Sequence, residues 1–281
     1  MPPDTDVGSC RQPPKKFSWR LGRAGKNRYD LMVTTKGAQF LDCFGLATGP
    51  GRLIVALVGA GGKTSLMLRL AAEGKALGKK VLVTTTTRIF VPPPSCYDEI
   101  DLEGTLFGGS PRAGAGVFVA GVLDPQLVGQ DKIKGCDLQL LARRVSQFDL
   151  VLIEADGSAK RALKGWRKTE PVVPQFATHT VGVVDIQSVG QPVSDQLVHR
   201  LQIFTELTGA AEGDLVSVHH LKKMIESDQG LFGKARGEEI LYINKVESQQ
   251  DRENGERLAA IAGGRNVVCG SLHENFCAVI R

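Results

Sequence analysis

A glycine-rich turn followed by a lysine and two hydroxyl residues is the feature of this chain that most directly suggests chemistry. Residues 59–65 read G-A-G-G-K-T-S and follow an apolar run over residues 53–58. Glycine has no Cβ, so the backbone N–H groups of such a turn can approach a phosphate closely. A helix that begins at the turn directs its N–H groups and the positive end of its dipole at the same anion. The pattern therefore predicts a phosphate-binding loop between a buried strand and a helix.

The side chains of this loop have separate expected tasks. We expect Lys63 to meet the charge of the β- and γ-phosphates, and Thr64 or Ser65 to offer a hydroxyl to Mg²⁺. The backbone N–H groups expected to hold the phosphates are those of Gly59, Ala60, Gly61, Gly62, Lys63 and Thr64. The usual spacing is G-x-x-x-x-G-K-[ST], and Leu57 stands where its first glycine would be. The loop is thus a variant with G-x-x-G-K-[ST] spacing, which resembles that of the peptidoglycan-type amide ligases.

Two carboxylates follow a second apolar run, F-D-L-V-L-I over residues 148–153. In a parallel sheet, ligands bind at the carboxyl ends of the strands, which is where Glu154 and Asp156 would lie. One acid can hold Mg²⁺ and another can orient an attacking water. An ordinary turn at Asp156 and Gly157 is the alternative. The candidate catalytic residues are therefore Lys63, Glu154 and Asp156, and the candidate metal ligands are Thr64 and Asp156; the sequence leaves open which carboxylate is closer to the metal.

Polar residues also follow two other predicted strands. Threonines occupy positions 84–87, and because side chains alternate along a strand only one or two of them can face a ligand. We take Thr86 as the candidate nucleotide contact, with Arg88 as a nearby cation. Residues 244–247 read N-K-V-E, close to the N-K-x-D motif by which GTPases read guanine, so Asn244 and Lys245 are further candidates. A polar loop start explains the same residues, and Glu247 stands where the guanine reader carries aspartate.

These residues must be positioned by an α/β fold. Apolar runs predict strands over residues 53–58, 81–83, 117–120, 148–153, 180–184, 240–243 and 267–268. Helices are predicted over residues 64–77, 134–145 and 252–262, and a helical insertion over 194–224 has Ser194 or Asp195 and Ser217 as caps and Gly209 as a stop. Strands that alternate with helices and are apolar throughout indicate a mainly parallel sheet with helices on both faces, similar to the P-loop NTPases.

Composition limits the remaining possibilities. The 281 residues are 42% apolar, and no apolar run approaches a membrane span or a secretory signal. Six scattered cysteines favour a reducing, cytoplasmic setting over a disulfide framework or a zinc site. Residues 1–30 hold seven Lys or Arg against three Asp, so most of the net charge of +5 lies there. We predict a basic, disordered extension over residues 1–36 and one nucleotide-binding domain over 37–281, and nucleic acid is not an expected partner.

Several stretches together resemble the YqeC family, whose members are described as accessory proteins of selenium-dependent molybdenum hydroxylases. The matching stretches are L-V-G-A-G-G-K-T-S (57–65), V-L-V-T-T-T-T-R-I-F (81–90), E-A-D-G-S-A-K-R-A-L-K (154–164), E-P-V-V-P (170–174), V-H-R (198–200), L-T-G (207–209), L-Y-I-N-K-V-E (241–247) and V-V-C-G-S-L (267–272). The resemblance implies a role in maturing or inserting the cofactor of such a hydroxylase. Its client would be the hydroxylase or a cofactor-synthesis enzyme.

The leading hypothesis is a Mg²⁺-dependent NTP-binding protein that hydrolyses its nucleotide, with ATP expected rather than GTP. Two alternatives remain open. The first is a nucleotide-gated chaperone or switch with negligible turnover that delivers a cofactor. The second is an ATP-dependent ligase or transferase that activates a small carboxylate or a selenium compound, as the ligase-like spacing of the loop suggests.

Overall fold

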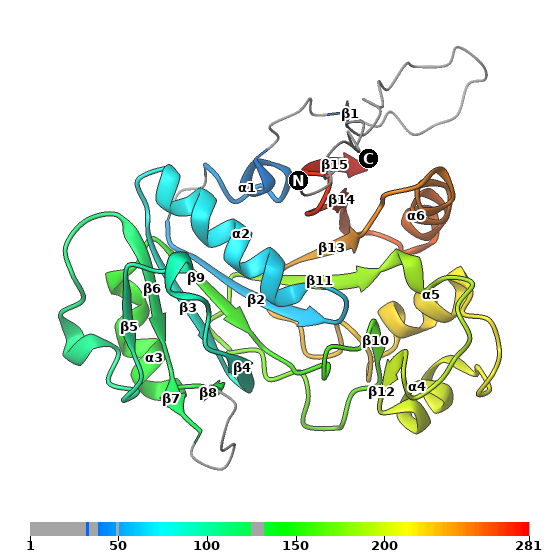
Figure 1. Ribbon diagram of the computed structural model, residues 1–281, viewed down its shortest axis with the longest axis horizontal. Coiled ribbons are helices and arrows are strands. Elements are labelled where there is room, and N and C mark those ends of the chain that lie inside the picture. The colour runs from blue at the N-terminus through cyan, green and yellow to red at the C-terminus, as the bar shows by residue number, and fades with distance from the viewer. Residues whose placement is uncertain (1–31, 34–38, 49–50, 125–131, 281) are drawn as a thin grey trace, which may run out of the picture.

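A ten-stranded sheet forms the centre of the protein in a computed structural model that describes residues 32–33, 39–48, 51–124 and 132–280 (Figure 1). The strand order is β1-β15-β14-β13-β11-β2-β9-β3-β6-β5. Pairing is parallel from β14 through to β5, and at one edge β15 pairs antiparallel with both β14 and β1. The prediction of a mainly parallel α/β sheet is therefore confirmed.

Every predicted strand is present, most of them longer than the apolar run that indicated them. These strands are β2 (Leu53–Gly59), β3 (Lys80–Thr85), β6 (Gly116–Ala120), β9 (Leu150–Glu154), β11 (His179–Asp185), β13 (Glu238–Asn244) and β14 (Asn266–Ser271). The remaining strands of the main sheet are β1 (Met32–Val33), β5 (Glu99–Asp101) and β15 (Phe276–Ile280). Two small sheets add β4 (Arg88–Phe90), β8 (Lys132–Lys134) and β7 (Val122–Leu123), and β10 (Leu163–Lys164) with β12 (Val198–His199).

Helices cover both faces of the sheet. The α-helices are α1 (Phe40–Cys43), α2 (Lys63–Ala76), α3 (Leu138–Arg144), α4 (Leu201–Thr208), α5 (Val218–Glu226) and α6 (Gln249–Ile261). Apolar residues of α1 and α2 form one core with alternate residues of β2, and those of α3 to α6 form a second core with the other residues of that strand. Burial on both faces explains why β2 is apolar throughout.

Two helices begin later than predicted, α6 begins three residues earlier than predicted, and one predicted cap is confirmed. Residues 132–134 pair with β4 as strand β8, so the helix predicted from residue 134 begins only at Leu138, capped by Asp137. Neither Ser194 nor Asp195 caps a helix, because residues 198–199 pair with β10 and delay α4 to Leu201. Ser217 caps α5 as expected, since its side chain accepts a hydrogen bond from the backbone N–H three residues later.

The topology gathers several loops around the start of α2. Strand β2 lies between β11 and β9, and β13 lies beyond β11, so the carboxyl ends of all four strands reach the same edge of the sheet (Figure 1). Residues 1–31 and 34–36 of the predicted basic extension lie outside the described residues, and residues 32–33 form β1 against β15. Among the described residues, none of the helices is both long and apolar enough to cross a membrane.

Candidate functional site

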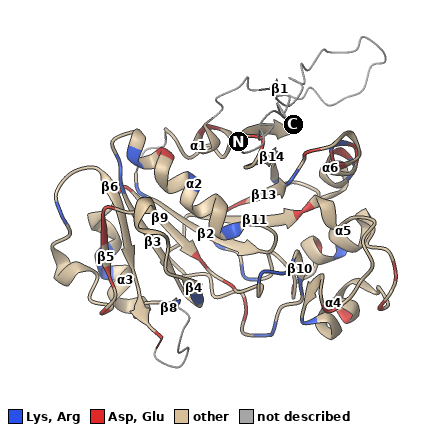
Figure 2. Ribbon diagram, in the orientation of Figure 1, with Lys and Arg blue, Asp and Glu red and all other residues tan. Residues whose placement is uncertain are grey.

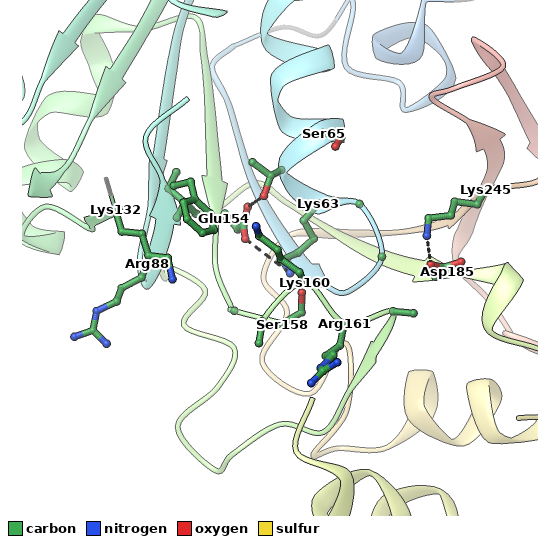
Figure 3. A pocket seen from close by; sticks show the side chains of 18 residues that line it. Lys63, Ser65, Arg88, Lys132, Glu154, Ser158, Lys160, Arg161, Asp185 and Lys245 are labelled. Atoms are coloured by element: carbon green, nitrogen blue, oxygen red, sulfur yellow. Dashed lines mark hydrogen bonds and ion pairs between the residues drawn. The ribbon is translucent and has the colours of Figure 1, made fainter. Parts of the chain in front are cut away.

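A cavity of about 710 Å³ opens at the carboxyl ends of these strands (Figure 3). Lys63 and Ser65 enter it from the first turn of α2, and Glu154 enters from the end of β9. Figure 3 shows Lys245 and Asp185 on one side and Arg88 and Lys132 on the other. The cavity therefore lies where the sequence predicted a phosphate site, between the glycine-rich loop and the neighbouring strand ends.

The three glycines of the loop are required by backbone conformation as well as by space. Gly59, Gly61 and Gly62 have φ values of 100°, 79° and 128°, a region that other residues rarely adopt. A Cβ on Gly61 would collide with Asp185, and one on Gly62 would collide with Asn244. The glycines thus let the loop pack against the ends of β11 and β13, in addition to leaving its N–H groups accessible.

The backbone N–H groups of the loop divide into two sets. That of Gly59 donates to the carboxylate of Asp156 at 3.1 and 3.2 Å, and that of Ala60 donates to the Val183 carbonyl at 3.1 Å. The first helical N–H with a partner is that of Leu66, bonded to the Gly62 carbonyl at 2.9 Å. Within the described chain, no acceptor is bonded to the N–H groups of residues 61–65. These five groups are the ones available to a ligand, a narrower and later set than the sequence predicted.

Lys63 is almost fully buried and is held by the protein itself. Its ammonium donates to the Gly59 carbonyl at 2.6 Å and lies 3.3 Å from Asp156 and 3.9 Å from Glu154. Two carboxylates therefore compensate its charge. Lys63 is thus a buried and paired cation that the protein fixes at the base of the loop.

Asp156 points away from the cavity, into the protein. It is fully buried and accepts hydrogen bonds from Lys164 at 3.1 Å and from the Trp166 indole at 2.7 Å, besides those from the loop. Burial alone would raise the pKa of this carboxyl, but the charges of Lys63 and Lys164 outweigh burial and leave the pKa below its usual value. Asp156 does not line the cavity, so it supports the loop from behind.

Glu154 is the carboxylate that faces the cavity. It accepts a hydrogen bond from the Thr64 hydroxyl at 2.6 Å, which brings together two oxygen ligands of the kind that Mg²⁺ prefers. Burial raises the pKa of Glu154, with Lys63 and the Thr64 hydroxyl opposing the shift. A divalent cation beside this pair would favour the ionised carboxyl. The oxygens of Thr64 and Glu154 would therefore suit a Mg²⁺ ion, and Glu154 lines the cavity whereas Asp156 does not.

The threonine run contributes to structure rather than lining the cavity. Thr84 donates to the Ala120 carbonyl at 2.8 Å and Thr85 to the Glu154 carbonyl at 2.7 Å. The hydroxyl of Thr86, the predicted nucleotide contact, donates to the Val172 carbonyl at 2.8 Å. None of the three lines the cavity. Threonine hydroxyls at these positions tie neighbouring strands and loops together.

The N-K-V-E segment packs against the loop with two of its members. The Asn244 amide donates to the Gly61 carbonyl at 2.8 Å, and its own oxygen is buried with no hydrogen-bond partner in the described chain. Lys245 lines the cavity and pairs with Asp185. Glu247 lies outside the cavity, where its carboxylate accepts hydrogen bonds from two side chains. The placement of Glu247 gives no support to guanine reading.

Several residues that line the cavity were not predicted from the sequence. They are Phe90, Lys132, Ser158, Lys160, Arg161 and Asp185. Asp185 had a usable signal, because it directly follows a predicted strand. The basic residues come from β8 and from the loop between β9 and β10. No local sequence pattern indicates that these two segments lie at the same cavity. Figure 2 marks in blue part of β4, where Arg88 lies, and loop segments between β4 and β10.

Comparisons with known proteins agree on one family. The model of the YqeC protein family matches residues 55–202, which include the loop, both acids and the strands between them. A protein of Escherichia coli (strain K12) named "Uncharacterized protein YqeC" is 31% identical over 186 residues, which cover 64% of this chain and 70% of the relative. No solved structure matches this chain.

Proposed function

This chain belongs to the YqeC protein family, and we propose that it is a Mg²⁺-dependent, P-loop NTPase-like protein that binds a nucleoside triphosphate. The observation that carries the proposal is the row of N–H groups of residues 61–65, which have no acceptor within the described chain and belong to residues that line the cavity. An anion at a helix N-terminus is stabilised by such groups and by the helix dipole.

The surrounding residues supply what a triphosphate and its metal require. Lys63 provides a fixed positive charge, and the Thr64 hydroxyl with the Glu154 carboxylate would hold Mg²⁺. Asn244 and Asp156 hold the loop in shape from outside the cavity. Hydrolysis at such a site needs positioning and charge neutralisation rather than covalent chemistry, and Glu154 is the group placed to orient a water.

The family resemblance extends the proposal to a biological role. We place the protein among accessory factors of selenium-dependent molybdenum hydroxylases, acting in the cytoplasm with the hydroxylase or a cofactor-synthesis enzyme as client. ATP is the expected nucleotide, since Glu247 is engaged elsewhere and does not face the cavity.

Calorimetric titration of the full chain with ATP and Mg²⁺ tests the proposal. Lys63→Ala is expected to abolish detectable binding, whereas Lys222→Ala, which removes a half-exposed lysine on α5, should leave the affinity unchanged. Because Lys63 is buried, Thr64→Ala and Thr64→Ser provide a second test that keeps the ion pairs intact. The alanine variant should lose the dependence of binding on Mg²⁺ and the serine variant should keep it. Wild-type affinity in Lys63→Ala would overturn the proposal.

Phosphate release separates hydrolysis from a switch. If wild-type protein binds ATP but releases phosphate only when a client is added, nucleotide binding gates delivery rather than driving turnover. Phosphate release by the protein alone would support hydrolysis. If Glu154→Gln abolishes this release while Mg²⁺-dependent ATP binding is retained, Glu154 acts on the attacking water rather than only on the metal.

A further inference from the structure

One wall of the cavity carries positive charge that the phosphate loop does not need. Lys132, Lys160 and Arg161 line this wall, and within the described chain no carboxylate lies within ion-pair distance of any of them. Lys63 and Lys245, which also line the cavity, are paired with buried carboxylates. The cations beside the loop are thus paired with carboxylates, whereas those of this wall have no carboxylate partner in the described chain. Arg161 is held in place by one hydrogen bond, from its guanidinium to the Gln196 carbonyl at 2.8 Å, which leaves its positive charge uncompensated.

An exposed aromatic ring holds two of these cations together. Phe90 at the end of β4 is 42% exposed, and the ammonium groups of Lys132 and Lys160 each lie 4.6 Å from its ring centroid. The two like charges are therefore less than twice that distance apart. Each is attracted to the ring, and a bound anion would relieve their mutual repulsion. We call Phe90, Lys132, Lys160 and Arg161 the cationic wall.

The backbone that presents this wall is strained. Ala159 and Lys160 both adopt left-handed conformations, with φ values of 49° and 61°. That conformation costs a residue other than glycine about 1–2 kcal/mol, so two in succession must be held by their surroundings. Lys164 provides such a restraint, since its ammonium donates to the Gly157 carbonyl at 2.6 Å and bonds to buried Asp156. Strain retained at a cavity is typical of a segment that is shaped for a ligand.

We propose that the cationic wall is a second binding site, which takes a phosphate-bearing small molecule while the phosphate loop holds the nucleotide. Lysine and arginine are the donors that proteins use for phosphate, and Phe90 offers a surface for an apolar or aromatic part of the same molecule. The inference rests on the proposed function, because it takes the loop to be filled by NTP. It deepens that function: the cavity brings two anionic ligands together, as a transferase requires and a simple hydrolase does not.

Phenyl phosphate is a suitable probe, because it combines one phosphate with one aromatic ring. The full chain is first saturated with a non-hydrolysable ATP analogue and Mg²⁺, and phenyl phosphate or inorganic phosphate is then titrated by calorimetry. We expect both to bind, and phenyl phosphate to bind more tightly. The double variant Lys160→Ala/Arg161→Ala should weaken the binding of both by about tenfold or more, since the loss of even one charge-assisted hydrogen bond costs about that factor.

Matched variants identify what each part of the wall does. Phe90→Ala should weaken the binding of phenyl phosphate and leave the affinity for inorganic phosphate nearly unchanged. Lys222→Ala/Lys223→Ala removes two cations from α5, outside the cavity, and should change neither. The affinity for the ATP analogue should stay within about threefold of wild type in all these variants, because the phosphate loop is untouched.

Other results would refute either the second site or the proposed function. If Lys160→Ala/Arg161→Ala weakens binding of the ATP analogue as strongly as Lys63→Ala does, the wall binds the nucleotide itself. The second site is then refuted, while the proposed function stands. If phenyl phosphate fails to bind, or binds the double variant as well as wild type, the second site is also refuted. If the ATP analogue does not bind to wild type but phenyl phosphate binds in a wall-dependent way, the proposed function fails and the anion site remains.

Discussion

Replacing the buried Asp156 by asparagine is expected to destabilise the protein strongly, although the two side chains have nearly the same shape. The carboxylate lies 3.3 Å from the Lys63 ammonium and 3.1 Å from that of Lys164. These lysine side chains are only 3% and 0% exposed, so water cannot take over the role of the missing charge. The substitution therefore leaves two buried cations without one of their counter-ions.

The size of the effect follows from the partners that remain. Removing one member of a buried ion pair costs about 3–5 kcal/mol. Here Lys63 keeps Glu154 at 3.9 Å and Lys164 keeps Glu170 at 3.3 Å, and the asparagine oxygen can still accept from an N–H group. The residual pairing places the expected loss of unfolding free energy near the lower end of this range, at about 3 kcal/mol.

Urea denaturation followed by far-ultraviolet circular dichroism measures this loss. Tryptophan fluorescence is unsuitable because the Trp166 indole is bonded to Asp156 itself. Glu226→Gln makes the matched change on an exposed pair, Lys222–Glu226 at 3.3 Å, and should cost no more than about 0.5 kcal/mol. A loss in Asp156→Asn below about 1 kcal/mol would refute the view that the loop depends on buried charge.

The effect of Asp156→Asn on the free energy of unfolding depends on pH. Because the pKa of Asp156 is lower in the folded than in the unfolded state, its ionisation stabilises the fold above the unfolded pKa of 3.8, and this contribution is lost as the pH falls through the folded pKa. Asparagine cannot be protonated in this range. The stability difference between wild type and Asp156→Asn should therefore be constant near neutral pH and shrink below about pH 4.

Three further predictions test the loop, a histidine and base recognition. Gly61→Ala should lower the free energy of unfolding, measured by urea denaturation, more than Gly190→Ala does. Both glycines have positive φ, but only a Cβ at position 61 would collide with Asp185. Equal losses in the two variants would contradict the predicted collision. Burial and neighbouring cations lower the pKa of His199 to about 4, so its ring signal in an NMR titration, assigned with His199→Gln, should move near that pH. The unfolded state then binds one more proton between about pH 4 and 6.5, and this group's contribution to stability falls as the pH drops through that window. Glu247→Gln should leave the ratio of ATP to GTP affinities unchanged in calorimetry, and a shift toward ATP would show that this carboxylate reads guanine after all.

The glycine-rich loop between β2 and α2 and the strands of the sheet could be predicted because their signals are local. Residues 53–65 contain a buried strand, a turn and a helix start in succession, and each requirement, apolar side chains or absence of Cβ, is met within a few residues. The departure at Leu57 also has a simple explanation. Leu57 is a fully buried residue of β2 that faces the core under α2, so it belongs to the strand and not to the loop.

The roles of the two acids could not be separated in this way. Glu154 and Asp156 are two positions apart, which in a continuous strand would place them on one face. Strand β9 ends at Glu154, and the direction of Asp156 is then set by Lys164 and Trp166, which come from the next loop and strand. The sequence therefore identified both carboxylates as candidates, whereas the fold placed one in the cavity and the other behind the loop.

The sequence by itself determined the class of sheet, the position of the glycine-rich loop between β2 and α2, and the family. Hydrophobic periodicity and glycine placement act over a few neighbouring residues, so they can be read without the fold. Only the tertiary structure decided which N–H groups are available and that Phe90, Lys132, Lys160 and Arg161 form one wall. These four residues come from three segments that are far apart in the chain, and only the packing of β4, β8 and the loop after β9 brings them to one cavity.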